Sequence, residues 1–236
     1  MKEEKSRPPF VVTIDGPAGS GKSTVAKGAA ERTGLRYLDT GKLYRALAYY
    51  LSENGIPPEE SPGLKIALSE ARITVQSGRV GVGGKDVTEF LHTSKIDGLV
   101  SQYAALPAIR EILIGLQREQ ACAPGLIADG RDMGSVVFPL ADLKIFLTAD
   151  AGERAKRRFL EQSAKGEDVE YEKVLSIVIS RDKTDSQREV APLVIPENAI
   201  IIDTTEKNAD TVISEVALLI EKARRATRNE EEKDVS

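Results

Sequence analysis

GPAGSGKS, Gly16 to Ser23, matches the pattern G-x-x-x-x-G-K-[ST] at every fixed position. The β-branched run FVVTID precedes it at residues 10–15, and the helical pattern TVAKGAAERT follows it. Glycines allow consecutive backbone N–H groups to converge on an anion, and a helix N-terminus adds positive potential. This strand-to-helix loop, the P-loop, is therefore typical of a site that cradles the phosphates of a nucleoside triphosphate.

Two side chains of the P-loop carry the chemistry. Lys22 is a point charge that can reach the β- and γ-phosphates, and the Ser23 hydroxyl is placed to ligate Mg²⁺. The alternative is a glycine-rich turn without a ligand, which would need neither the lysine nor the hydroxyl.

Strand and helix patterns alternate along most of the chain. Apolar runs predict strands at residues 10–14, 35–40, 125–130, 143–148 and 199–203. Helical patterns occupy residues from the P-loop to about 32, then 41–55, 106–120, 152–164, 171–182 and 209–224. Continuous apolar strands separated by helices indicate a five-stranded parallel sheet covered on both faces. With right-handed crossovers, the prediction is a three-layer α/β sandwich.

Two segments depart from this alternation. Residues 71–93 show β-branched alternation with SGR and GG turn signals, which predicts a small antiparallel sheet inserted into the domain. The linker-like PPEESPG, residues 57–63, precedes it. The tail from residue 226 to 236 is dense in charge, and we expect it to be disordered. Residues 1–225 should form a single domain.

Composition excludes several classes of protein. Of the 236 residues 41% are hydrophobic and 30% charged, with a net charge of −4, which argues against non-specific nucleic-acid binding. Cys122 is the single cysteine and His92 the single histidine, so an intrachain disulfide and a multi-histidine metal site are excluded. The N-terminus lacks the apolar core of a signal peptide, and no run approaches 18 apolar residues. We expect a cytoplasmic protein without a membrane partner.

Charged residues recur where parallel strands should end. ADGRDMG places Asp129, Arg131 and Asp132 directly after an apolar strand, and ligands of open α/β sheets bind beyond such strand ends. Arg45 lies one turn into the helix after another strand, from which it can point at an anion near the P-loop. The alternatives are a surface turn and a solvated helix face.

Two predicted helices carry further arginines on one side each. GERAKRRF brings Arg154, Arg157 and Arg158 together, because residues three and four apart share a helix face. These arginines could close over transferring phosphates, or they could form a basic solvated helix. Arg181, Asp185 and Arg188 follow the same spacing if their helix continues, and surface ion pairs are the alternative reading there.

The surroundings of the P-loop favour a small kinase. No N/T-K-x-D element for reading guanine is present, and ATP-driven machines are usually larger. Arginines at several strand ends suit an enzyme that holds two phosphorylated ligands and screens their repulsion. Two alternatives stay open: a small kinase acting on UMP, AMP or a non-nucleotide such as shikimate, and a nucleotide-binding switch that phosphorylates no small molecule.

Five segments together resemble the bacterial cytidylate kinases over residues 10–224: GPAGSGKS, LDTGKLYR, SQYAALPAIRE, LIADGRDMGSVVFP and RDKTDSQREVAPL. The resemblance implies the nucleoside-monophosphate kinase fold, with a parallel core sheet, a region that binds the monophosphate at about 62–105, and a short helical LID at about 152–168. The extra β insert of these bacterial enzymes coincides with residues 71–93. The implied reaction is Mg·ATP with CMP or dCMP giving ADP and CDP or dCDP, by a monomer.

The resemblance also implies a role for each matching residue. Lys22, Arg131 and Arg181 would be catalytic, and Mg²⁺ would lie at Ser23 with its waters oriented by Asp129. ATP would contact Gly16, Pro17, Ala18, Gly19, Ser20, Gly21, Lys22, Ser23, Thr24, Arg154, Arg157 and Arg158. CMP would contact Thr40, Arg45, Ser101, Arg110, Arg131, Asp132, Arg181, Asp185 and Arg188. Thr40 stands where the family usually has serine, so the hydroxyl is kept.

Overall fold

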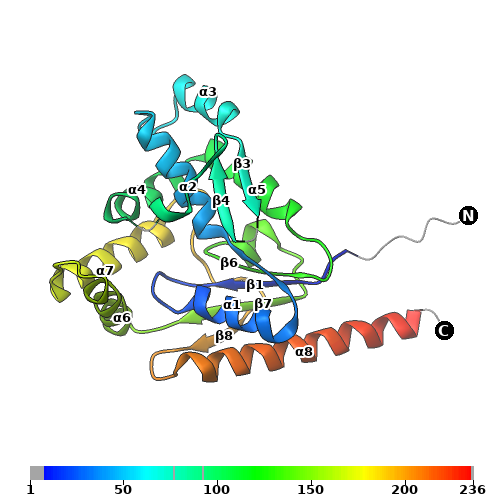
Figure 1. The fold of residues 1–236 in the computed structure, drawn as a ribbon. Helices are drawn as coiled ribbons and strands as arrows, with labels where there is room; N and C mark the ends of the chain where they lie inside the picture. The colour runs from blue at the N-terminus through cyan, green and yellow to red at the C-terminus, as the bar shows by residue number, and fades with distance from the viewer. Residues whose placement is uncertain (1–7, 77, 92, 235–236) are drawn as a thin grey trace, which may run out of the picture.

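The computed structural model describes residues 8–76, 78–91 and 93–234 (Figure 1). Its central sheet has five parallel strands in the order β2-β6-β1-β7-β8. These strands are β1 (Val11–Asp15), β2 (Arg36–Asp39), β6 (Leu126–Gly130), β7 (Leu143–Thr148) and β8 (Ile200–Asp203). The predicted parallel sheet is therefore confirmed. The single histidine, His92, lies outside the described residues.

Helices cover both faces of the sheet because alternate strand residues point in opposite directions. In β6, Ile127 packs toward α1 (Lys22–Thr33) and α8 (Ala209–Asp234), whereas Leu126 and Ala128 pack toward the opposite side. That opposite side holds α2 (Thr40–Glu53) and α5 (Pro107–Glu119) (Figure 1). The three-layer arrangement thus follows from strands that are apolar on both faces.

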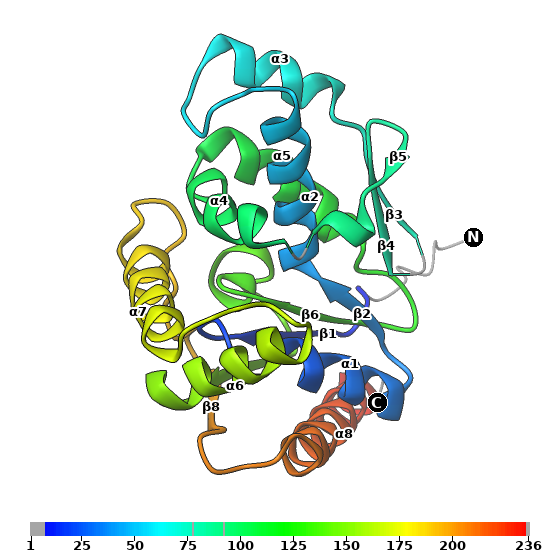
Figure 2. The ribbon, with the colours of Figure 1, turned by 60° about the vertical axis from the view of Figure 1, so that its left-hand side comes forward.

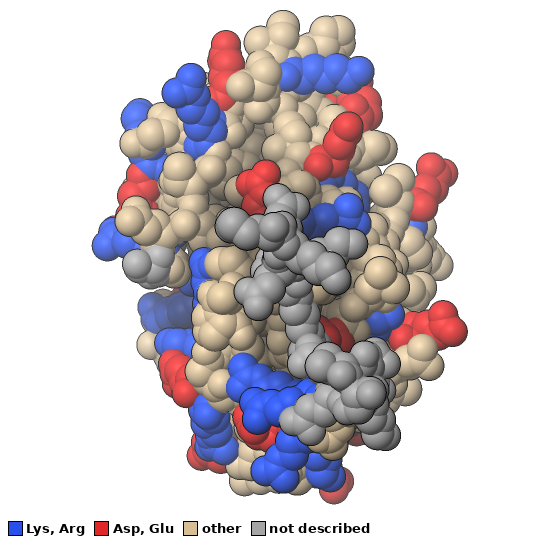
Figure 3. Space-filling model, turned by 90° about the vertical axis from the view of Figure 1, so that its right-hand side faces the viewer, with Lys and Arg blue, Asp and Glu red and all other residues tan. Residues whose placement is uncertain are grey.

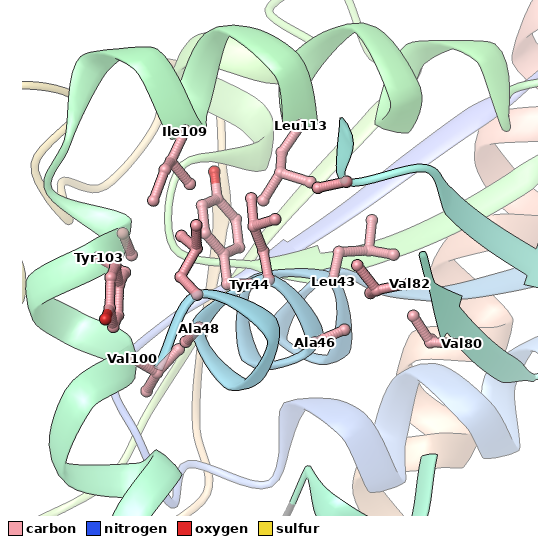
Figure 4. Close-up of a cluster of buried hydrophobic side chains, with 14 of the residues drawn as sticks. Leu43, Tyr44, Ala46, Ala48, Val80, Val82, Val100, Tyr103, Ile109 and Leu113 are labelled. Carbon is pink, nitrogen blue, oxygen red and sulfur yellow. The ribbon is translucent and has the colours of Figure 1, made fainter. Parts of the chain in front are cut away.

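The predicted insert is a three-stranded antiparallel sheet of β3 (Ile73–Gln76), β4 (Arg79–Val82) and β5 (Lys85–Asp86). Figure 4 shows Val80 and Val82 of β4 beside Leu43 and Ala46 of α2, so the insert shares the core of the main domain. A short helical turn, η1 (Thr88–Phe90), leads on from this sheet.

Two helices beside the insert escaped the sequence analysis. α3 (Pro62–Glu70) begins inside the segment predicted as a linker, because the Ser61 hydroxyl accepts from the N–H of Leu64 at 3.1 Å and caps it. α4 (Ser94–Ala104) follows the insert and packs on α2. In α3, Ser61 followed by Pro62 at the first helical position is a helix-start signal that the linker interpretation overlooked, whereas Gly98 weakens the helical pattern of α4.

The predicted LID consists of α6 (Ala151–Ala164) and the segment after it. This helix packs against α7 (Tyr171–Gln187) through a small cluster of Ala155, Val174 and Val178. Figure 2 shows both helices below α4, across from the insert region. Because α7 continues to Gln187, Arg181 and Asp185 lie on one helix, as the spacing predicted. Arg188 does not: it follows the last helical residue in an extended conformation, with a ψ of 141°.

The tail differs from the expectation. Disorder was predicted from residue 226, but α8 continues as a helix through Asp234. Alanine, arginine, glutamate and lysine have high helix propensity, and extending a formed helix costs little compared with nucleating one.

No single described helix is long and apolar enough to cross a membrane. Lys95–Ala104 and Pro107–Glu119 meet the length and composition only when taken together, and they bend by 93° at the break between them. Their apolar side chains Val100, Ile109 and Leu113 are buried in the core against α2 (Figure 4).

Candidate active site

The P-loop joins the end of β1 to the start of α1. A Cβ atom at Gly16 would lie 2.0 Å from the main-chain oxygen of Leu147, so only glycine fits there. Gly21 caps α1 with a φ of 88°, and Lys22 is the first helical residue. The Lys22 ammonium donates to the main-chain oxygen of Pro17 at 2.6 Å. Burial, together with the nearby charge of Arg131, holds the pKa of Lys22 well below its usual range.

Asp129 connects the P-loop to the neighbouring strands. The Ser23 hydroxyl donates to its carboxylate at 2.7 Å, and the Thr40 hydroxyl donates to its main-chain oxygen at 2.6 Å. Burial and the carboxylate of Asp39 raise the pKa of Asp129 to about 7. A hydroxyl and a carboxylate, both oxygen donors, therefore meet beside the loop that is predicted to hold phosphates.

The motif after β6 pairs its charged residues with arginines from other elements. Asp132 is buried and receives Arg110 of α5 and, at 3.4 Å, Arg188 at the end of α7. Arg131 pairs with Asp185 of α7 at 2.8 Å. These contacts bring together the CMP residues that the resemblance implied on three separate segments.

The Arg110 side chain is almost fully buried. Its guanidinium lies over the Tyr44 ring, 5.7 Å from the ring centroid, and donates to the main-chain oxygen of Ala104 at 3.3 Å. Burial outweighs the two paired arginines and raises the pKa of Asp132. Such a dry cluster of donors and acceptors is suited to reading the polar edge of a base.

Asp15 does not line the cavity but supports a segment beside it, a role that the sequence analysis missed. Its carboxylate accepts the N–H groups of Met133 and Gly134, each at 2.8 Å, and thereby fixes the π-helical turn η2 (Met133–Val137) that follows Asp132. Burial raises the pKa of Asp15 to about 6. The signal in the sequence was a carboxylate at the end of an apolar strand, immediately before Gly16.

The three arginines of α6 have different surroundings. Arg154 is buried, donates to the main-chain oxygen of Ala18 at 3.1 Å, and pairs with Asp182 through two hydrogen bonds of 3.0 and 2.6 Å. Arg157 donates to the main-chain oxygen of Thr204 at 2.6 Å. Of the three, only Arg158 reaches the cavity between the P-loop and Arg131. ATP contacts of all three stay predictions.

A cavity of about 200 Å³ lies between the P-loop and the segment that carries Asp129, Arg131 and Asp132. Arg181 lies in its wall, and burial, with the charges of Arg131 and Arg45, lowers the Arg181 pKa to about 10. The predicted site residues that line the cavity are Ala18, Gly19, Lys22, Ser23, Thr40, Arg45, Ser101, Arg110, Asp129, Arg131, Asp132, Arg158, Arg181, Asp185 and Arg188. Lysine and arginine side chains outnumber the carboxylates in this lining, which favours an anionic ligand.

The family model and the similar curated proteins reported below all have the same description. The family model described as cytidylate kinase matches residues 12–222. A cytidylate kinase of Thermotoga neapolitana is 43% identical over 219 residues, which are 92% of this chain and 99% of that protein. One of Pseudomonas aeruginosa (strain LESB58) is 44% identical over 212 residues, 87% of this chain and 93% of that protein. A solved gluconokinase from Sinorhizobium meliloti 1021 is 15% identical with a TM-score of 0.48, covering 96% of this chain and 98% of its own, a likeness too distant to assign a substrate.

Proposed function

The chain belongs to the cytidylate kinase family, and we propose that the cavity between the P-loop and Arg131 holds ATP on the P-loop and CMP or dCMP among the arginines. The chain is an ATP-dependent nucleoside-monophosphate kinase that converts CMP to CDP. Phosphorylation of dCMP is part of the proposal. The observation that carries the site assignment is the shared cavity, which Lys22 and Ser23 line from one side and Arg131 and Arg188 from the other.

The reaction needs no covalent intermediate on the protein. An oxygen of the CMP phosphate attacks the γ-phosphorus in line, and the bond to the β,γ-bridging oxygen breaks, so ADP leaves with that electron pair. Lys22, Arg131 and Arg181 would neutralise charge on the transferring group. Because Lys22 is buried and both arginines are partly buried, their electrostatic attraction is stronger than it would be in water.

Mg²⁺ fits this site as an ion carried by the nucleotide. Among the described residues, no group of three or more His, Cys, Asp or Glu side chains could hold a metal by itself. The Ser23 hydroxyl and the Asp129 carboxylate, 2.7 Å apart, would hold Mg²⁺ directly or through its waters. When bound, the ion would neutralise charge on the phosphates.

We assign recognition of cytosine to Arg110, Asp132 and Arg188. Asp132 can accept hydrogen bonds, and the two arginines can donate them, within a cluster that holds the groups in fixed positions. Arg45 and Arg131 would bind the CMP phosphate through guanidinium forks. Ser101, Thr40 and Asp185 would lie around the nucleoside, since all three line the cavity.

Three statements stay predictions: that the protein is a monomer, that it acts in the cytoplasm, and that its partners are small molecules alone. On the visible part of the face in Figure 3, basic and acidic side chains are interspersed, which favours small-molecule substrates over nucleic acid.

A coupled assay of ADP release with CMP, dCMP, UMP and AMP tests the proposed function. We expect a strong preference for CMP or dCMP, because Arg110, Asp132 and Arg188 suit the polar edge of cytosine. Preference for UMP or AMP would contradict the assignment of the base site. Release of ADP that CMP does not stimulate would favour a nucleotide-binding switch.

A further inference from the structure

Asp97 pairs with two arginines that line the cavity. Its carboxylate receives Arg45 of α2 on Oδ1 and Arg158 of α6 on Oδ2. The Asp97 side chain is 22% exposed and lies on α4, in the region at about 62–105 that is predicted to bind the monophosphate, whereas α6 belongs to the predicted LID. One carboxylate therefore links three elements, and the sequence analysis did not identify it.

The charges around Asp97 explain why it is ionised. Burial acts to raise its pKa, but Arg45, Arg158 and Arg181 outweigh burial, so the pKa is lower than usual. Arg45 and Arg158 contact the two oxygens of the same carboxylate, so the negative charge of Asp97 offsets the repulsion between them. A phosphate entering between these arginines would offer the same compensation with more charge and more acceptor oxygens.

We propose that Asp97 is a positioning residue that takes the place of a phosphate in the ligand-free enzyme. It holds Arg45 and Arg158 until CMP and ATP bind, and both arginines must then leave it. The proposal rests on the proposed function, which assigns these two arginines to phosphates. Asp97 should therefore weaken binding of ligands that carry a phosphate, and leave binding of the nucleoside unaffected.

Asp97→Asn tests this, with CMP and cytidine binding measured by isothermal titration calorimetry. We expect about three- to tenfold tighter CMP binding, since the partly exposed ion pair between Asp97 and Arg45, the arginine assigned to the CMP phosphate, is removed as a competitor. The affinity for cytidine should change less than twofold. Asp97→Glu, which keeps the charge, should bind CMP like the wild type. The matched control is Glu161→Gln on α6, which removes an exposed carboxylate paired with Lys165 and should bind CMP like the wild type.

Unchanged or weaker CMP binding by Asp97→Asn would overturn the proposal, and so would an equal gain for cytidine. If the variant is too unstable to assay, it is placed in the Arg158→Met background, where one facing cation is absent. Tighter CMP binding than in Arg158→Met alone is expected there, and its absence overturns the proposal as well.

Arg45→Met separates this proposal from the proposed function. Loss of CMP affinity in that variant, with no gain in Asp97→Asn, refutes only the role of Asp97. If Arg45→Met binds CMP like the wild type, the assignment of Arg45 to the CMP phosphate is wrong.

Discussion

Lys22 is buried and has the main-chain oxygen of Pro17 as its hydrogen-bond acceptor, at 2.6 Å. Neighbouring cations add to the cost of keeping it charged, so the phosphates of ATP would be a far stronger partner. At the scale of single residues, the site is therefore organised by charges held away from water until ligands arrive.

Lys22→Met should lower turnover by on the order of a hundredfold or more, because it removes one desolvated cation from the developing charge. Steady-state rates of ADP release, with CMP binding measured separately by calorimetry, check this expectation. The CMP affinity should stay near that of the wild type. Turnover near the wild-type rate would exclude Lys22 from the mechanism.

The raised pKa of Asp129 predicts that the free energy of unfolding depends on pH. Its pKa rises from 3.8 in the unfolded chain to about 7 in the fold, so the folded state holds an extra proton between these values. The stability from this group is fully present below about pH 4 and is lost as the pH rises through about 7.

Asp129→Asn removes the ionisation but keeps an oxygen acceptor for Ser23. We expect this variant to gain on the order of 2 kcal/mol over the wild type at pH 8, and little at pH 4. Urea unfolding at both pH values is the measurement, and activity should fall. An equal difference at the two pH values would show that Asp129 does not titrate in this way.

At the scale of elements, β1 supports both halves of the site. Its last residue, Asp15, precedes the P-loop and also accepts the two N–H groups that begin η2. From α5, Arg118 donates to the main-chain oxygen of Val137 at 2.8 Å and fixes the other end of that turn. The P-loop and the segment that carries Asp132 are thus both held by β1.

Asp15→Asn should raise the KM for CMP more than the KM for ATP. An amide oxygen can accept only part of what the carboxylate accepts, so one buried N–H group loses its partner, at about 1–3 kcal/mol of stability. Steady-state kinetics and thermal unfolding test both effects, with the exposed Asp86→Asn as the control. An equal rise in both KM values would argue against a specific effect on Asp132.

At the scale of the whole molecule, the core ends before the C-terminal helix does. Val216 and Ile220 of α8 are buried against β1 and α1, and Arg224 donates to the main-chain oxygen of Thr33 at 2.9 Å. Beyond Arg224, α8 adds helix but no residue of the buried core among those described.

Deleting residues 226–236 should leave kcat and the melting temperature close to wild type, since residues 226–229, where burial is described, are exposed or half-buried. Deleting residues 216–236 should unfold the protein or lower its melting temperature strongly, because two buried side chains are lost at about 2–5 kcal/mol each. Differential scanning calorimetry distinguishes the two truncations. A large loss from the shorter deletion would give the tail a structural role.

Much of the architecture could be predicted because it depends on short-range patterns. The apolar run before Gly16 and the helical pattern after Ser23 determine the strand, the loop and the first helix. Alternation of such units predicts a parallel sheet with its ligands beyond the strand ends. Helix α3 was missed because its start signal, Ser61 followed by Pro62, lies in a segment whose composition is typical of a linker. Helix α4 was missed because Gly98 weakens its helical pattern.

The amino-acid sequence by itself determined the phosphate-binding loop, the parallel sheet and most of the residues that line the cavity. Only the tertiary structure decided which groups Asp97 and Asp15 contact. Asp97 pairs with Arg45 and Arg158, 52 and 61 positions away, and Asp15 holds Met133, 118 positions away. Local periodicity carries no information about such partners, because strand order and helix packing bring them together.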